Sequence, residues 1–219
     1  MKDNKISDYQ KALNVWAIIL IIWSVYRAKF IMPEWFDEFI AKPLVFVLPV
    51  YYYITKKEKK NFFNEIYLNT KKITSDVILG IGVGGLFLFS AIIANYLKYR
   101  KIFVFDKGLD LKSLMIILAI ALATGICEEI LSRGFVLKRL YDESKNIVTA
   151  SFFASILFFF LHVPILFTNQ RINGSTLLMF MAADMILSLA NSYLFIERKS
   201  LVLPILIHAF YNVATILFI

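Results

Sequence analysis

A small set of ionisable and amide side chains lies within long apolar stretches of the sequence, where such groups can do chemistry. The set comprises Glu128, Glu129, Arg133, His162, Asp184, Asn191, His208 and Asn212. An ionisable group inside a membrane-spanning helix is unfavourable unless it is paired or hydrated, so each is a functional candidate. Both histidines of the chain belong to this set. A carboxylate, two imidazoles and an amide on three helices are the groups of a hydrolytic site.

Helical spacing sorts these residues by face. Glu129 and Arg133 are four residues apart and share a face, which we interpret as a helix-end salt bridge. Glu128 points elsewhere and is predicted to be the freer carboxylate. His208 and Asn212 are also four apart, so one helix face presents an imidazole together with an amide; a packing pair is the structural alternative.

A polar stripe on the preceding helix has a simpler interpretation. Asp184, Ser188 and Asn191 follow the i, i+4, i+7 spacing of one helix face. This pattern is more typical of packing or water contact than of catalysis. His162 by itself could equally supply one hydrogen bond between helices.

Peptide hydrolysis requires a nucleophilic water, a proton for the leaving amine and a group that stabilises negative charge. A carboxylate in a low-dielectric cavity can act as a base together with a histidine. Imidazole and amide N–H groups that converge on one oxygen form an oxyanion hole, in which each donor contributes ~3 kcal/mol. These polar groups should face a water-filled cavity between helices, because irregular or polar groups are not tolerated against lipid.

The composition indicates how such groups are positioned. Of 219 residues, 59% are apolar and 18% are charged, and the mean hydropathy is +0.69. In soluble domains, roughly 45–50% of residues are apolar and about 25% are charged. So much apolar surface cannot be buried in one soluble core, and disorder or a coiled coil is excluded. The sequence therefore predicts an all-α polytopic transmembrane bundle that forms one domain over residues 1–219, with a motif-bearing catalytic core at 113–216.

About seven spans are predicted, with an eighth left open. The apolar stretches are Ala12–Tyr26, Pro43–Thr55, Val77–Leu97, Ser113–Cys127, Asn146–Gln170, Ile172–Ile196 (which includes Asp184) and Ser200–Ile219. The second reaches full width only if Phe39–Ala41 join it and Lys42 snorkels. Residues 56–72 fit either an interfacial amphipathic helix or a solvated loop.

The net charge of +8 comes from basic residues clustered between apolar stretches, which suits anionic headgroups rather than nucleic acid. With seven spans and a cytoplasmic N-terminus, the inner segments carry 15 Lys and Arg and the outer segments 9. The basic N-terminus is followed by no cleavage site and leads into an uncleaved first span. The lysine- and isoleucine-rich composition indicates a multi-pass protein of a bacterial plasma membrane.

The glycines at 80, 82 and 85 spell the dinucleotide-binding pattern G-x-G-x-x-G. That pattern requires a strand before it and a helix after it. Here it lies within a long apolar stretch, so we interpret the glycines as a close contact between spanning helices.

Three motifs resemble those of one family. Residues 128–134 (EEILSRG) fit E-E-x-x-x-R-G, residues 158–162 (FFFLH) fit F-x-x-x-H, and residues 208–212 (HAFYN) fit H-x-x-x-N. Over residues 113–216 the sequence resembles the CPBP family of CAAX proteases and bacteriocin-processing (Abi) proteins, and is similar to type II CAAX prenyl endopeptidases.

The resemblance implies a glutamate-type intramembrane endopeptidase that needs no cofactor. Glu128 and His162 would activate a water, and His208 and Asn212 would hold the oxyanion. Glu129 and Arg133 would fix the helix end. The substrate would be a membrane-associated peptide or protein, and a leader or signalling peptide is the expectation in a bacterium.

Four alternatives stay open at this point. Zinc could bind Glu128, His162 and His208, although no H-E-x-x-H motif is present. The single cysteine, Cys127, forms no internal disulfide and could be a nucleophile, but the adjacent acids oppose this. The chain could be a non-catalytic bacteriocin-immunity or regulatory membrane protein. The fourth alternative is a proton-coupled transporter that uses Asp184. The inverted sequence repeat typical of many transporters is not visible in this sequence.

Overall fold

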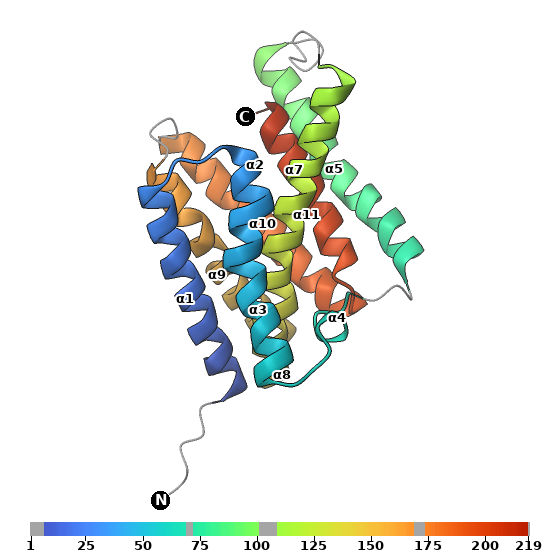
Figure 1. Cartoon of the computed structure of the whole chain (residues 1–219). Helices are drawn as coiled ribbons and strands as arrows, with labels where there is room; N and C mark the ends of the chain where they lie inside the picture. Colours follow the sequence, from blue (N-terminus) through green and yellow to red (C-terminus); the bar gives the residue numbers. More distant parts are fainter. Residues whose placement is uncertain (1–6, 69–71, 101–108, 169–173, 219) are drawn as a thin grey trace, which may run out of the picture.

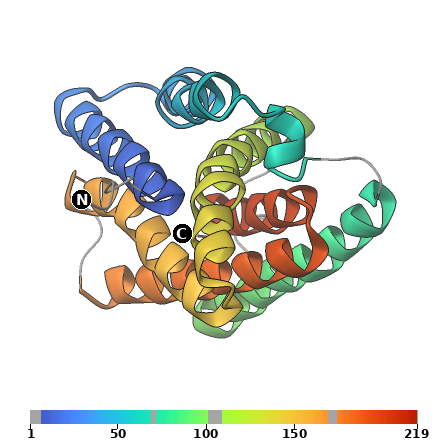
Figure 2. The same cartoon turned by 90° about the horizontal axis from the view of Figure 1, so that it is seen from below.

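The computed structural model describes residues 7–68, 72–100, 109–168 and 174–218, and the described chain is helical without strands. Figure 1 shows the helices arranged as a bundle, and Figure 2 shows the same bundle from one end. The prediction of an all-α fold is confirmed. Helix starts follow ordinary capping rules: the Ser7 and Asp110 side chains accept the Gln10 and Ser113 N–H groups at the starts of α1 and α7.

The elements, with η for π-helical segments, are α1 (Asp8–Lys29), α2 (Glu34–Phe36), η1 (Asp37–Ala41), η2 (Pro43–Val47), α3 (Leu48–Tyr52), η3 (Tyr53–Lys57), α4 (Phe62–Glu65), α5 (Ile73–Tyr99), α7 (Leu111–Glu129), η4 (Ile130–Leu137), α8 (Lys138–Ser144), α9 (Ile147–Thr168), α10 (Gly174–Arg198) and α11 (Val202–Phe218). Residues 34–57 form one continuous helical segment that extends beside α1 (Figure 1). The elements α7, η4 and α8 likewise follow one another without a break.

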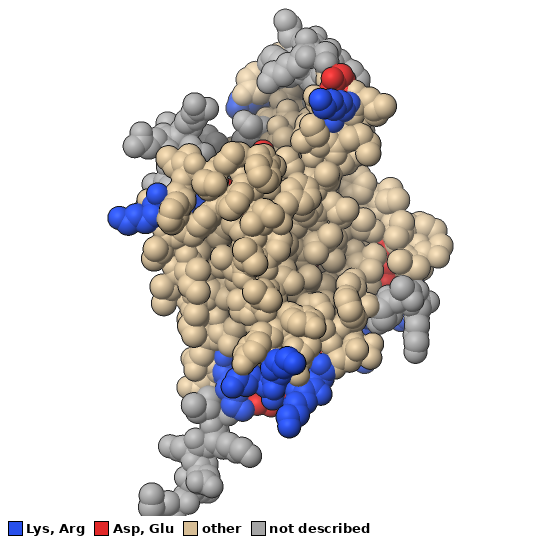
Figure 3. Space-filling view, viewed as in Figure 1, with Lys and Arg blue, Asp and Glu red and all other residues tan. Residues whose placement is uncertain are grey.

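Four of the described helices are long and apolar enough to cross a membrane. They are Asp8–Lys29, Ile73–Tyr99, Leu111–Ser144 and Ile147–Pro164, and the apolar helix Val202–Phe218 is shorter. Figure 3 shows Lys and Arg gathered mainly at one end of the molecule, with a broad band that carries few charged side chains above it. The chain therefore has the organisation of a helical membrane protein, whereas the seven-span count and the orientation stay predictions.

Within the part that the structure describes, residues 56–72 do not form the interfacial amphipathic helix that was one of the two interpretations of this segment. Among the described residues of this segment, only Phe62–Glu65 is helical beyond η3, and positive φ angles at Lys59 and Tyr67 interrupt the backbone on either side. Phe62 and Ile66 are buried against the bundle. Phe62 and Ile66 therefore cover protein, whereas Phe63 is 56% exposed. Residues 69–71 lie outside the described residues.

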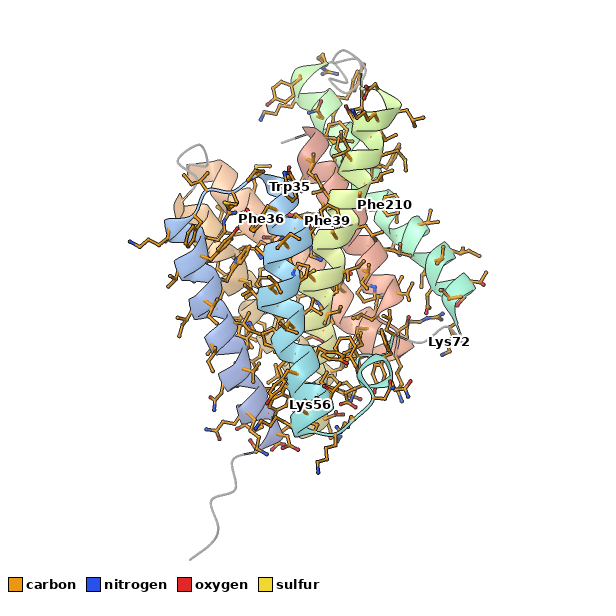
Figure 4. All side chains as sticks on the ribbon, in the orientation of Figure 1. Trp35, Phe36, Phe39, Lys56, Lys72 and Phe210 are labelled. Carbon is orange, nitrogen blue, oxygen red and sulfur yellow. The ribbon has the colours of Figure 1, made fainter. Side chains whose placement is uncertain are left out.

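The glycines of α5 form a close helix contact, as the sequence predicts, but only one face of the helix takes part. A Cβ at Gly80 would lie 2.8 Å from Leu206 Cβ, and a Cβ at Gly84 would lie 2.6 Å from Phe210 Cδ2. Gly82 and Gly85 have no such neighbour among the described atoms within 4 Å. Figure 4 labels Phe210 beside the backbone of α5. The glycines therefore set the position of α11.

A hydrophobic core joins α1, the 34–57 segment, η4 and α9. Trp23 of α1 is 1% exposed and its ring meets that of Phe46 edge-on, with centroids 5.0 Å apart. Phe135 of η4 contacts Tyr53 in the same way at 5.4 Å. This core fixes η1 and η2 against α7 and η4. The paired glutamates, Glu128 and Glu129, are the last two residues of α7, and η4 follows them directly.

Candidate active site

Glu128, His162 and His208 come together from three helices. Glu128 Oε2 at the end of α7 lies 3.4 Å from His162 Nε2 on α9 and 3.6 Å from His208 Nε2 on α11. The Glu128 and His208 side chains are almost fully buried, and the His162 side chain is 22% exposed. Any opening of this cluster therefore lies on the His162 side.

The hydrogen bonds of the two Nδ1 atoms indicate the tautomers of His162 and His208. His162 Nδ1 lies 3.2 Å from the Phe158 carbonyl, which can only accept, so Nδ1 carries the proton. His208 Nδ1 lies 2.8 Å from Glu129 Oε1, an acceptor as well. Both Nε2 atoms therefore face Glu128 Oε2, and this oxygen has no hydrogen-bond partner among the described residues. A water molecule between these atoms could bond to the carboxylate and an imidazole together.

Glu129 does more than close a helix-end salt bridge with Arg133, the role expected from the sequence. Its Oε1 accepts Arg133 Nη1 at 3.0 Å, Asn191 Nδ2 at 3.0 Å and His208 Nδ1 at 2.8 Å. Glu129 is fully buried, and the Arg133 guanidinium lies over the Phe158 ring at 4.4 Å. The carboxylate thus orients His208, because a charged acceptor fixes which ring nitrogen carries the proton.

The backbone after the two glutamates widens into η4. Such π-helical turns occur frequently at functional sites because they re-aim side chains. Gly134 in η4 lies against Ile66. A Cβ added at position 134 would lie 2.9 Å from Ile66 Cβ. The glycine of the first motif is therefore required by close packing of the 62–67 segment on η4.

Lys42 is a site residue that sequence reasoning missed. Instead of snorkelling to the membrane surface, it is 4% exposed and donates to Glu128 Oε1 at 2.8 Å. Its Nζ also lies 2.7 Å from Glu38 Oε2. Glu128 is therefore not a free carboxylate, since one of its oxygens carries an ion pair. The i, i+4 spacing of Glu38 and Lys42 within an apolar stretch was the available signal.

The polar stripe of α10 also reaches the site. Asp184 accepts the Tyr211 hydroxyl at 2.8 Å, and its Oδ2 lies 4.0 Å from His162 Nδ1. Asn191 bridges Glu129 and the Pro204 carbonyl at 3.2 Å. Packing is thus part of the role of the stripe, but two of its members support site residues.

Asn212 and Cys127 lie beside the cluster. The Asn212 amide, one turn from His208 on α11, donates to the Ala121 carbonyl of α7 at 3.4 Å. Asn212 therefore faces α7 as His208 does. Cys127 is 4% exposed and precedes Glu128 on a helix, so its side chain points to a different face.

The described residues contain no group of three or more His, Cys, Asp or Glu side chains placed to hold a metal ion. The arrangement most similar to a metal site is formed by Glu128, His162 and His208. In it, the Lys42 ammonium already supplies positive charge to the Glu128 carboxylate. A surface groove of about 700 Å³ lies elsewhere, between α1 and the segment around residues 49–60. The predicted water-filled cavity at the cluster stays a prediction.

The family comparison agrees with this architecture. Residues 110–214, a little under half of the chain, match the family of type II CAAX prenyl endopeptidases, Rce1-like. The matched region extends from α7 into α11 and contains Glu128, His162 and His208. Over that region it confirms the resemblance given by the three motifs. No curated protein and no solved structure matches the chain.

Proposed function

We propose that the protein is an intramembrane endopeptidase that hydrolyses a peptide bond of a membrane-associated peptide or protein. The observation that carries this proposal is the convergence of Glu128 Oε2 with the Nε2 atoms of His162 and His208, at 3.4 and 3.6 Å. Glu128 Oε2 has no hydrogen-bond partner among the described residues, so it is available to accept a hydrogen bond from a water. The family match supplies independent support for protease activity.

The reaction begins with a water held between Glu128 Oε2 and His162 Nε2. Glu128 takes a proton as the water oxygen attacks the carbonyl carbon of the scissile bond, and negative charge develops on the carbonyl oxygen. The proton then passes to the leaving nitrogen as the C–N bond breaks. Water thus supplies the hydroxyl of the new carboxyl group and one hydrogen of the new amine.

His208 and Asn212 stabilise the oxyanion in this scheme. Glu129 holds the His208 ring through the bond to Nδ1, and Nε2 donates to the developing charge when the ring carries a proton on both nitrogens. The Asn212 amide lies one turn further along α11 and exchanges its hydrogen bond to Ala121 for one to the substrate. Each of these donors accelerates the reaction by about 10²–10³-fold.

The test uses the purified protein in proteoliposomes with a library of membrane-anchored peptides. Wild type is compared with Glu128→Gln, His162→Ala and His208→Ala, and Cys127→Ala serves as a matched control next to the site. We expect Glu128→Gln to lower kcat by about 10²–10⁴-fold, and Cys127→Ala to retain activity. Cleavage in ¹⁸O-labelled water should place one label in the new carboxyl group.

Three results would contradict this mechanism. Cleavage by Glu128→Gln at the wild-type rate would remove the proposed base. Activity that a strong chelator abolishes and zinc restores would support the zinc-dependent version of the hydrolase, on the same three side chains. A cellular phenotype that all three site variants leave intact would support a non-catalytic immunity or regulatory role.

A further inference from the structure

Lys42 forms an ion pair with Glu128 across the boundary between the two halves of the chain. The residues are 86 positions apart, and the side chains of both are at least nine-tenths buried. Lys42 lies outside residues 110–214, where the family match is found. The N-terminal half therefore contributes a full positive charge to the carboxylate that is proposed to activate water.

The contact is part of a ladder between two helices. On the 34–57 segment, Glu38 and Lys42 are four residues apart; on α7, Thr124 and Glu128 are four residues apart. Thr124 Oγ1 donates to Glu38 Oε2 at 2.6 Å, and Lys42 Nζ bonds Glu38 Oε2 at 2.7 Å and Glu128 Oε1 at 2.8 Å. The ammonium thus lies between two carboxylates, one on its own helix and one on α7.

Pro43 lies within this helical segment at the first position of η2. A proline ring has no N–H and clashes with a carbonyl one turn earlier in an α-helix. The wider π-helical turns on both sides of Lys42 accommodate it. The π-helical backbone therefore lies where the Lys42 side chain meets α7.

We propose that Lys42 is a positioning residue for peptide hydrolysis, which rests on the proposed function of Glu128. By binding Oε1, it directs Oε2 toward the two imidazoles. By its charge, it favours the ionised carboxylate, the form that can accept a proton from water, where burial favours the neutral acid. Glu38, clamped by Thr124, holds the ammonium in place.

The experiment measures kcat and KM on one membrane-anchored peptide for wild type, Lys42→Met, Lys42→Arg and Glu128→Gln. We expect Lys42→Met to lower kcat about 100-fold, with KM within about twofold of wild type. Lys42→Arg keeps the charge and two or more donors, so it should restore kcat to within about tenfold of wild type. A residue that only held the helices together would change stability or KM together with kcat, rather than kcat alone.

A matched control tests general damage to the same segment. Asp37 is buried on η1 and is paired with Arg27 and with the Tyr26 hydroxyl, 2.5 Å away, but it lies outside the ladder to Glu128. Asp37→Asn should therefore leave kcat near wild type. A loss of kcat in Asp37→Asn equal to that in Lys42→Met would overturn the proposal.

Lys42→Met leaves the carboxylates of Glu128 and Glu38 without this cation, so a second variant guards against failure to fold. The double variant Lys42→Met/Glu38→Gln removes one of these charges, and we expect the same loss of kcat. Wild-type kcat in either folded variant would refute the role of Lys42. If Glu128→Gln were inactive in that case, the proposed function would stand; if Glu128→Gln were active, the proposed function itself would fail.

Discussion

The contact of Gly84 with Phe210 gives a prediction in which the same chemical change is made at two positions. An ideal Cβ at Gly84 would lie 2.6 Å from Phe210 Cδ2 and 2.9 Å from Phe210 Cβ. The ring can rotate away, but Phe210 Cβ is fixed to the backbone of α11, so Gly84→Ala forces α5 and α11 apart. At Gly85, one residue further on, no described atom lies within 4 Å.

The magnitudes follow from packing and helix propensity. Overpacking a fitted contact costs about 1–3 kcal/mol, and a fixed Cβ favours the upper part of that range. Replacing a helical glycine with alanine stabilises the helix by about 1 kcal/mol. Gly84→Ala should therefore lower the free energy of unfolding by about 1–2 kcal/mol. Gly85→Ala should raise it by up to about 1 kcal/mol.

The assay is reversible unfolding in mixed micelles, followed by helix content, with activity measured in parallel. Because α11 carries His208 and Asn212, Gly84→Ala should also lower kcat, whereas Gly85→Ala should not. The double variant Gly84→Ala/Phe210→Ala should recover the part of the loss caused by the clash. If Gly84→Ala and Gly85→Ala agreed within about 0.5 kcal/mol, the close approach of α5 and α11 would be refuted.

Two further predictions concern Asn191 and Glu65. Asn191→Leu removes the hydrogen bonds that Asn191 donates to Glu129 and to the Pro204 carbonyl. Because a hydrogen bond to a charged group contributes about 1.5–3 kcal/mol, kcat should fall about tenfold or more. The control is the neighbouring Ser192→Ala, which should leave kcat unchanged because the buried Ser192 Oγ has no hydrogen-bond partner among the described residues. Burial alone would raise the pKa of Glu65, but hydrogen bonds and charge from Lys138 and Lys60 outweigh it and lower that pKa below its ordinary 4.5. A carboxyl whose pKa is lower in the folded than in the unfolded state stabilises the fold above the unfolded pKa, and that stabilisation disappears as pH falls through the folded pKa. The Tm of wild type should therefore exceed that of Glu65→Gln at pH 7, with a difference that shrinks as pH falls below 4.5, and an equal difference in acid would contradict the assignment.

The sequence alone predicted a helical membrane fold and singled out Glu128, His162 and His208, which lie together in the structure. Both depend on local information. Hydropathy over about twenty residues marks a span, and the spacing of residues along a helix fixes which side chains share a face. The pairing of Glu129 with Arg133 and the common direction of His208 and Asn212 follow from this spacing, as does the interpretation of the α5 glycines as a helix contact.

Only the tertiary structure showed which faces meet across helices. In the sequence, Lys42 lies at the edge of a short apolar stretch, for which snorkelling is an ordinary outcome. Its pairing with Glu128 depends on the register of the 34–57 segment against α7, and no local pattern encodes that register. The attachment of His208 to Glu129 depends in the same way on how α11 lies against α7 and α10. Helical periodicity relates side chains within one helix, whereas contacts between helices are set by packing over the whole bundle.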